Sequence, residues 1–556
     1  MSTFNDTPHY EAHRNFIVSL RTQPCANVHS VLADERCLFV RETEECRESV
    51  HYIDYMHFMY CAVDSSNVAL FSAAIVGLLM VVVVLASIIH YLCTRRYVDA
   101  ILYASKSFRL TEYMAGVTLL TYGNGLPHVL SQVKHHQIAD TERIYNQYLG
   151  SAVYQIAFLA STVIFMGRKF FVHPEVIVPN IIAVMLVAVL VEAFMYVEYV
   201  GLFKTTILLI VYVIFLVALS AIASALNKRG DGARSLILLR DGDGNVLEIA
   251  EPQTSSEERF GLWQQWYHYR DAYRTANWYG RLYTICMAPV ELLALLILPR
   301  VHHLLPLGGW NKYLFTVSLN VLPPFLFYTL LAESLTPNEM GFLCLGSLLT
   351  TLAGSVAICI LTTNDQRPVF FAYVALFTVF GTSYLVLLLT RELVAILETL
   401  SIIADISPPT FAITILSWGH CWIDLVTYIT LARRGYERLA FAACYGSPLF
   451  NILIGLCVVF SVQMIRTGSM TIHVRDGTSG PTCAVHIFVI SFGLLLTLLF
   501  TRFWARASLA MCLMKSYATF MVFIVLHEIE FLHGYGTDHN DDGEFFQDQI
   551  PQHAGS

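Results

Sequence analysis

The sequence SWGHCWIDL at residues 417–425 has a counterpart in TYGNGLPHV at residues 121–129. Each stretch contains an aromatic residue, a glycine and a polar residue, followed after three positions by an ionisable residue and a branched aliphatic one. A second pair, LGSAVYQI at 149–156 and YGSPLFNI at 445–452, is separated by the same offset of 296 residues. A constant offset across two segments and the loop between them indicates an internal repeat.

The composition of the chain is that of a membrane protein. Of its 556 residues, 56% are hydrophobic and 14% are charged, and the mean hydropathy is +0.57. Its repeated long apolar runs exclude a single soluble domain. A helix needs about 20 residues to cross a hydrocarbon core of about 30 Å, so we predict an all-α polytopic membrane protein with about twelve transmembrane helices. The predicted spans are 68–93, 113–133, 148–166, 177–198, 205–226, 312–333, 341–362, 369–390, 407–428, 440–464, 485–501 and 508–532.

The positions of Lys and Arg predict the orientation of these spans. The short loops on one side carry most of them, including Arg95, Arg96, Arg433 and Arg434, so this side is expected to be cytoplasmic and both termini to lie opposite. The run at 282–299 is short and contains prolines, which predicts that it lies along the interface. The two repeats then cross the membrane in opposite directions. This predicts two inverted five-helix repeats of exchanger type plus a two-helix insert.

These assignments divide the chain into six regions. The predicted regions are a non-cytoplasmic cysteine-containing head (1–67), a first membrane half (68–226) with its repeat (113–166), a cytoplasmic loop (227–311) with the interfacial helix (282–299), an inserted helix pair (312–362), a second membrane half (363–532) with its repeat (407–464), and an acidic non-cytoplasmic tail (533–556).

The cysteines of the head indicate that it lies in an oxidising compartment. Its four cysteines would form two disulfides there, in a pairing that the sequence leaves open; they are Cys25, Cys37, Cys46 and Cys61. Asn5 begins a glycosylation sequon. No apolar signal-peptide segment or transit-peptide pattern precedes the head. These features favour the plasma membrane or a membrane of the secretory pathway.

Each repeat motif carries two polar residues at the i,i+4 spacing, which places them on one face of a helix. They are Asn124 and His128 in the first motif, and His420 and Asp424 in the second. Ionisable groups within spans face the bundle interior and mark ion pathways. We therefore predict a cation site with one fixed negative charge near the bilayer midplane, where inverted repeats meet. The predicted metal ligands are Asp424, Asn124 and Asn451, and the other predicted site residues are Gly125, His128, Ser151, Gln155, His420, Cys421 and Ser447.

The residues at 392–456 resemble the second alpha-repeat of the cation/calcium exchangers, in particular the mitochondrial-type sodium/calcium exchanger group. The run LARRGYERLAFAACYGSPLFNIL is the most specific part, and MAGVTLLTYGNGLP at 114–127 resembles the first repeat. The resemblance implies a cation antiporter, not an enzyme, that exchanges Ca²⁺ for Na⁺ (or Li⁺ or H⁺) by alternating access without a cofactor. It also implies the mitochondrial inner membrane as an alternative location. The expected partners are the lipid bilayer and inorganic cations, with no nucleic acid.

The motifs also depart from the family pattern. His128 replaces the aspartate of Gly-Asn-Gly-Ala-Pro-Asp in the first repeat, and in the second, Gly-Asn-Ser-Ile-Gly-Asp, the four middle residues are replaced and Asp424 remains. Because Ca²⁺ gains from each carboxylate, losing one acid is expected to weaken calcium binding. Two hypotheses stay open. The protein is an antiporter whose selectivity has shifted, toward protons or a transition metal, or a non-transporting scaffold in which protonated His128 pairs with Asp424.

Overall fold

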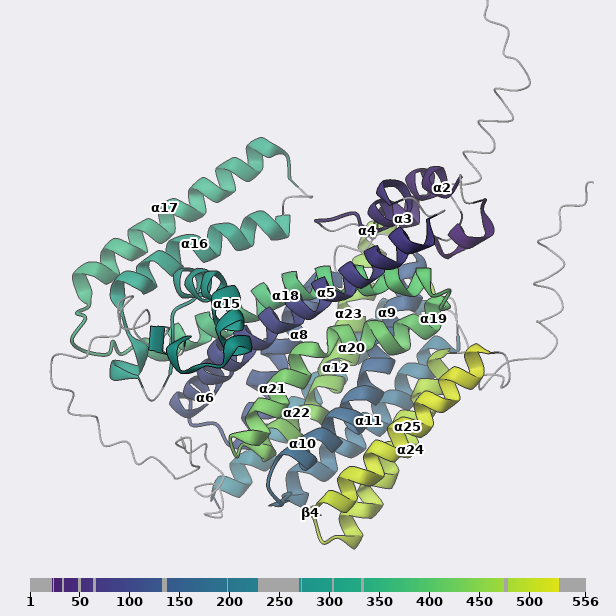
Figure 1. Ribbon diagram of the computed structural model, residues 1–556. Coiled ribbons are helices and arrows are strands. Elements are labelled where there is room, and N and C mark those ends of the chain that lie inside the picture. Colours follow the sequence, from purple (N-terminus) through teal and green to yellow (C-terminus); the bar gives the residue numbers. More distant parts are fainter. Residues whose placement is uncertain are drawn as a thin grey trace, which may run out of the picture.

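The protein is a bundle of long helices with a small helical head at one end and a helical hairpin beside it (Figure 1). The computed structural model describes residues 23, 25–32, 35–48, 52–63, 67–132, 138–197, 199–228, 270–271, 273–302, 305–331, 335–474 and 479–529. Asn5, most of the predicted cytoplasmic loop and the acidic tail lie outside the described residues.

The first half begins with one continuous helix over Val68–Ser107, which comprises α5, the π-helical turn η4 and α6. The elements of this half are α5 (Val68–Leu92), η4 (Cys93–Tyr97), α6 (Val98–Ser107), α7 (Glu112–Ala115), η5 (Gly116–Leu120), α8 (Thr121–Gln132), α9 (Ile138–Val153), η6 (Tyr154–Leu159), α10 (Ala160–Met166), α11 (Pro174–Met195) and α12 (Leu202–Lys228).

The second half repeats this order of elements. They are α18 (Phe371–Ile403), α19 (Pro408–Phe411), η8 (Ala412–Leu416), α20 (Ser417–His420), α21 (Trp422–Arg433), α22 (Glu437–Phe450), η9 (Asn451–Gly455), α23 (Leu456–Thr467), α24 (Ser479–Phe500) and α25 (Ala507–Glu528). Two short antiparallel ladders join loops of the two halves: β1 (Phe170–Phe171) pairs with β4 (Trp504–Ala505), and β2 (Tyr199–Gly201) with β3 (Thr471–His473).

Among the described residues, eleven helices are long and apolar enough to cross a membrane, or twelve when the bent pair Pro408–His420 and Trp422–Arg433 is one span. The predicted span at 113–133 is helical as far as Gln132 but is not one of them, because Thr, Asn and His lower its hydropathy. Most residues at 113–130 are buried or half-buried. The protein is thus an integral multi-pass membrane protein.

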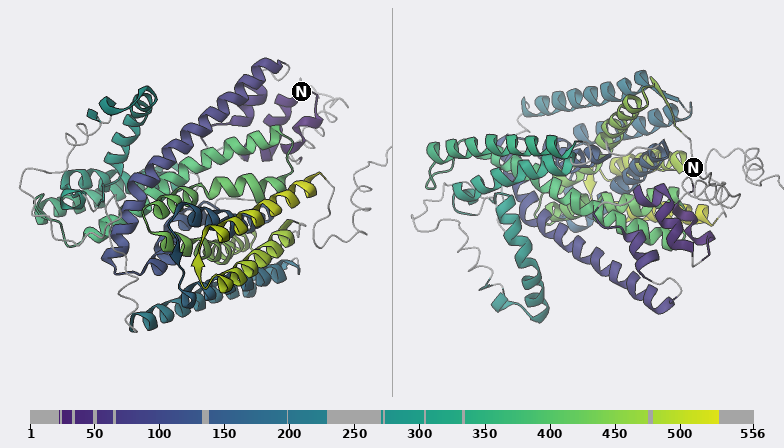
Figure 2. Two further views of the ribbon diagram at one scale, coloured as in Figure 1. Left: turned by 60° about the horizontal axis from the view of Figure 1, so that its bottom comes forward. Right: turned by 90° about the horizontal axis from the view of Figure 1, so that it is seen from above.

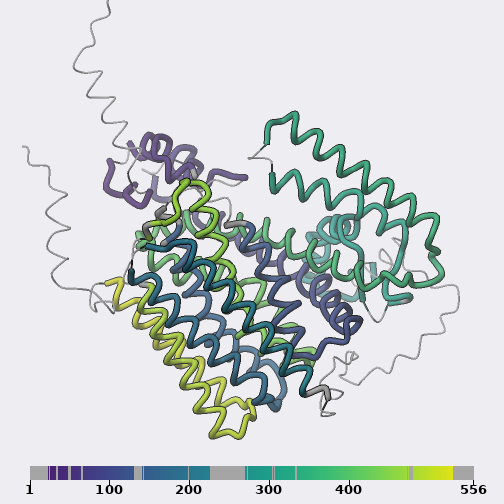
Figure 3. Tube along the Cα trace, turned by 180° about the vertical axis from the view of Figure 1, so that it is seen from behind, coloured from purple at the N-terminus to yellow at the C-terminus, as the bar shows by residue number. Residues whose placement is uncertain are grey.

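The insert contains α15 (Trp278–Ile297), η7 (Pro306–Gly309), α16 (Lys312–Leu331) and α17 (Pro337–Leu361). The helices α16 and α17 form a hairpin that stands beside the bundle, on the far side from the head (Figures 1 and 3). In the right-hand view of Figure 2, α15 runs across the direction of α16 and α17. By length and composition α15 is one of the eleven candidate spans, so its interfacial placement stays a prediction.

The long helices Val68–Ser107 and α18 pack against one another. Each also forms an ion pair with the repeat of the other half. Asp99 at the end of the first accepts from Arg434 of the second repeat at 2.5 Å. Glu398 in α18 pairs with Arg143 of the first repeat at 2.7 Å. Each long helix therefore contacts both halves of the molecule.

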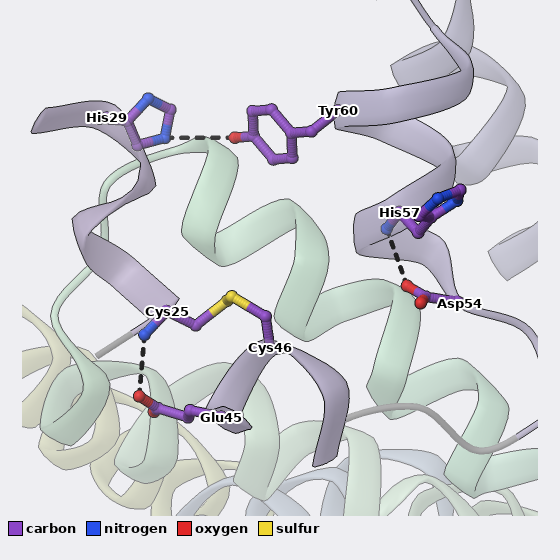
Figure 4. The surroundings of a disulfide bond; sticks show 7 residues. All are labelled: Cys25, His29, Glu45, Cys46, Asp54, His57 and Tyr60. Carbon is purple, nitrogen blue, oxygen red and sulfur yellow. Dashed lines mark hydrogen bonds between the residues drawn. A yellow bond between two sulfur atoms is a disulfide. The ribbon is translucent and has the colours of Figure 1, made fainter. Parts of the chain in front are cut away.

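The head consists of η1 (Cys25–Ser30), α2 (Arg36–Glu42), α3 (Glu44–Glu48), α4 (Tyr55–His57) and η3 (Phe58–Ala62). The structure pairs Cys25 with Cys46 and Cys37 with Cys61. Figure 4 shows the first of these disulfides, beside which the Cys25 backbone N–H donates to the Glu45 carboxylate at 2.8 Å. The head also contacts α18, since the Tyr55 hydroxyl donates to Glu392 at 3.0 Å.

Candidate functional site

The first helix of each repeat contains a π-helical turn immediately before its motif. These turns, η5 at Gly116–Leu120 and η8 at Ala412–Leu416, lie 296 residues apart. After each turn a hydroxyl donates to the carbonyl five residues earlier, Thr121 to Gly116 at 3.0 Å and Ser417 to Ala412 at 2.9 Å. π-helical turns locally widen a helix and recur at functional sites. The sequence repeat is thus a repeat of local backbone geometry.

The second helix of each repeat packs closely on the first helix of the other. A Cβ atom at Gly150 would lie 2.7 Å from the Ser417 hydroxyl, and a Cβ atom at Gly446 would lie 3.0 Å from the Thr121 hydroxyl. Gly150 and Gly446 are 296 positions apart in the sequence, and so are Thr121 and Ser417. Small residues allow such close approach of helices in membranes. The two repeats are therefore related by a pseudo-twofold exchange of contacts.

The two motifs meet in antiparallel directions. Asn124 donates from its amide to Asp424, whereas one turn further along, the His128 ring lies 4.2 Å from the His420 ring, measured between centroids. Residue numbers therefore rise along the first motif in the direction in which they fall along the second. This is the arrangement that inverted repeats predict.

Asp424 is buried and its carboxylate is held by neutral amides. Gln155 donates from Nε2 to Asp424 Oδ2 at 2.7 Å and lies 3.6 Å from Cys421 Sγ, while Asn124 donates to Oδ1. The predicted pairing of an imidazolium with Asp424 is absent among the described residues, because the His128 ring instead contacts His420, Tyr148 and, at 3.2 Å, Gln147. Amide dipoles therefore offset part of the carboxylate charge.

Two predicted site residues with amide side chains have buried oxygens that receive no hydrogen bond from any described residue. They are Gln155 Oε1 and Asn451 Oδ1, which occupy corresponding positions of the two repeats. A buried acceptor left unpaired costs free energy, and cations such as Ca²⁺ and Na⁺ take oxygen ligands. Within the described ranges, no group of three or more His, Cys, Asp or Glu side chains is placed to hold a metal ion. The chemistry that fits is one carboxylate with neutral oxygens.

The remaining predicted residues surround this centre. Ser447 lies 2.9 Å from the Tyr428 hydroxyl and 3.4 Å from that of Thr121, and Ser151 is buried beside Cys421. A Cβ atom at Gly125 would lie 2.9 Å from Asn451 Oδ1. The repeat alignment therefore identified residues that the fold brings together.

Residues outside the predicted set also contact it, among them Tyr97, Tyr428 and Gln147. The i,i+4 spacing from Asp424 was a usable signal for Tyr428. Tyr97 donates to Asn124 Oδ1. No pattern in the sequence indicated this contact, because the neighbouring Arg95 and Arg96 predict a loop at this position.

Several known proteins are similar to this chain. Residues 78–221 and 372–526, just over half of the chain, match the family described as sodium/calcium exchanger protein. The chain is 26% identical to a mitochondrial sodium/calcium exchanger protein of Gallus gallus, over 92% of this chain and 91% of the relative, and 25% identical to that of Homo sapiens, over 92% and 90%. A solved sodium-calcium exchanger, 12% identical, aligns over 81% of this chain and 98% of its own with a TM-score of 0.42. This chain, with both of its repeats inside the matched segments, belongs to the sodium/calcium exchanger family.

Proposed function

We propose that this membrane transporter exchanges Ca²⁺ for Na⁺ by alternating access, at a site centred on Asp424. The observation that carries the proposal is the buried carboxylate at the junction of two inverted repeats, in contact with Gln155, whose amide oxygen has no hydrogen-bond donor among the described residues. The corresponding oxygen of Asn451 also lacks a donor there and lies against Gly125 of the first motif. A buried carboxylate is costly without a cationic partner. A transported cation supplies that partner once in each half of the cycle.

We propose that cation binding replaces the amide N–H groups at Asp424. In the structure the amides of Asn124 and Gln155 donate to the two carboxylate oxygens. An amide offers either a donor or an oxygen acceptor, depending on its rotation. A cation beside Asp424 repels the N–H groups and attracts the oxygens. The same side chains thus serve the empty and the loaded site.

We propose that selectivity is shifted relative to a site with two acids. With Asp424 as its carboxylate, the site is neutral with Na⁺ bound and keeps one positive charge with Ca²⁺. His128 occupies the position of the second acid, and its ring lies 4.2 Å from the His420 ring at an angle of 45°. A proton on either histidine places a positive charge about one turn from Asp424. Protons therefore compete with the transported cation.

A second candidate function is a non-transporting scaffold. The observation that favours it is that Asp424 accepts hydrogen bonds from two buried amides of the first repeat. In this case the site is a structural remnant that joins the two halves.

Flux in reconstituted vesicles separates the two functions. We expect the purified full chain in sodium-loaded liposomes to take up ⁴⁵Ca²⁺ when diluted into sodium-free medium, and to stop when a sodium ionophore collapses the gradient. Uptake equal to that of protein-free liposomes, in parallel with absent ²²Na⁺ exchange, would support the scaffold.

The membrane in which the protein resides is part of the proposal. We propose the plasma membrane or a membrane of the secretory pathway, supported by the two disulfides of the head, since disulfides persist in oxidising compartments. The chicken and human relatives are named as mitochondrial. Cell fractionation is the test, with the protein expected in surface or secretory membranes; enrichment with inner mitochondrial membranes would contradict this.

A further inference from the structure

Tyr97 reaches the candidate site from outside both repeats. It lies in η4, within the long helix Val68–Ser107, and its side chain is fully buried. Its hydroxyl donates to Oδ1 of Asn124, whose Nδ2 in turn donates to Asp424. A chain of hydrogen bonds therefore runs from the long helix to the carboxylate.

The contact is built into one half of the molecule. A Cβ atom at Gly123 would overlap the Tyr97 hydroxyl, so glycine is needed for the hydroxyl to approach Asn124. At the corresponding positions of the other half, a Cβ atom at Gly419 would lie 3.7 Å from a methyl group of Leu393. The other half therefore has an apolar group at ordinary contact distance where the first half has a closely packed hydroxyl.

The hydrogen bonds define the direction of the Asn124 amide. An ionised carboxylate only accepts, so the amide N–H group faces Asp424 and the carbonyl oxygen faces Tyr97. In this orientation the oxygen of Asn124 is turned away from a cation at Asp424. Asn124 must reverse its amide before it can act as an oxygen ligand.

We propose that Tyr97 is a positioning residue that supports both orientations of the Asn124 amide, an inference that rests on the proposed function. A hydroxyl both donates and accepts. Tyr97 donates to the carbonyl when the site is empty and accepts from the N–H group when a cation holds the carbonyl. The long helix is thereby coupled to the occupancy of the site.

The Tyr97→Phe variant is expected to raise the KM for Ca²⁺ about three- to tenfold, the scale of one lost hydrogen bond, with a smaller change in maximal rate. The ring and its packing remain. Without the hydroxyl, the loaded site leaves a buried N–H group unpaired and the empty site leaves a carbonyl unpaired. Buried N–H groups tolerate this less well than carbonyls, so the loaded state loses more.

The measurement is sodium-driven ⁴⁵Ca²⁺ uptake by the full chain in liposomes, compared across a double-mutant cycle with Asn124→Ala. If Tyr97 acts through Asn124, Tyr97→Phe changes KM in the parent but not in the Asn124→Ala background. Tyr113→Phe is the matched control, because this buried hydroxyl contacts the His173 backbone at 2.9 Å, and it should keep the parent KM. Gly123→Ala, which displaces the hydroxyl, should raise KM as Tyr97→Phe does.

The outcomes are distinct. An unchanged KM in Tyr97→Phe, or in Gly123→Ala if Tyr97→Phe does not fold, overturns the inference while parent flux upholds the proposed function. An equal change in both backgrounds of the cycle also overturns it. A parent without cation flux overturns the proposed function and this inference with it.

Discussion

Replacing Asp424 with asparagine is expected to reduce sodium-driven calcium flux by about 100-fold or more, to the level of protein-free liposomes. Asp424 is the acid that both repeats enclose, and its carboxylate accepts hydrogen bonds from two amides. Removing one partner of a buried charge interaction costs about 3–5 kcal/mol, and each 1.4 kcal/mol is tenfold in affinity. Because the substitution removes charge and little volume, the fold should survive, with a melting temperature within a few degrees of the parent.

The matched control is Glu192→Gln. Glu192 also lies in a candidate span and accepts a hydrogen bond from Tyr145 at 2.7 Å, but it lies outside the two motifs. This variant should transport at a rate close to that of the parent. Parent-like flux in Asp424→Asn would show that the carboxylate is not the transport ligand, and the scaffold would then be the better description.

Replacing His128 with aspartate is expected to strengthen calcium binding about 10- to 100-fold. Position 128 corresponds to position 424 in the other repeat, and the His128 ring already lies against the opposing motif. The variant gives the site a second carboxylate, and Ca²⁺ gains more from an added charge than Na⁺ does. The two acids repel one another when no cation is bound, so stabilisation of the variant by Ca²⁺ should exceed that of the parent.

The measurement is the KM for Ca²⁺ in liposomes, together with the shift in melting temperature on adding Ca²⁺. His128→Asn is the control, because it has nearly the size of aspartate without the charge. A gain in His128→Asn equal to that in His128→Asp would assign the effect to removal of the imidazole. No gain in either would mean that position 128 does not face the bound cation.

The sequence and the structure agree where the information is local or repeated. Hydropathy over windows of about 20 residues identified the membrane helices, and the offset of 296 residues identified the repeats whose motifs meet at Asn124 and Asp424. The charge count predicted opposite directions for the repeats, and the contact of His128 with His420 shows the motifs antiparallel. These features follow from composition and periodicity, which need no knowledge of distant contacts.

Other features arise only from contacts between distant segments. Arg95 and Arg96 end the first predicted span at residue 93, yet the helix continues to Ser107, and Arg96 is buried within it. Only that continuation carries Tyr97 to Asn124. Charged residues in a sequence indicate a loop, and only the folded structure shows that one of them is buried within a helix.

The sequence by itself determined that this protein spans a membrane many times, contains two inverted repeats and keeps one motif carboxylate, because hydropathy, period and residue identity are properties of the chain. The tertiary structure alone decided that amides rather than an imidazole hold Asp424, that the rings of His128 and His420 are in contact, and that Cys25 pairs with Cys46. Hydrogen bonds and disulfides form over a few ångströms, and the partners stand at those distances only after both halves have packed together.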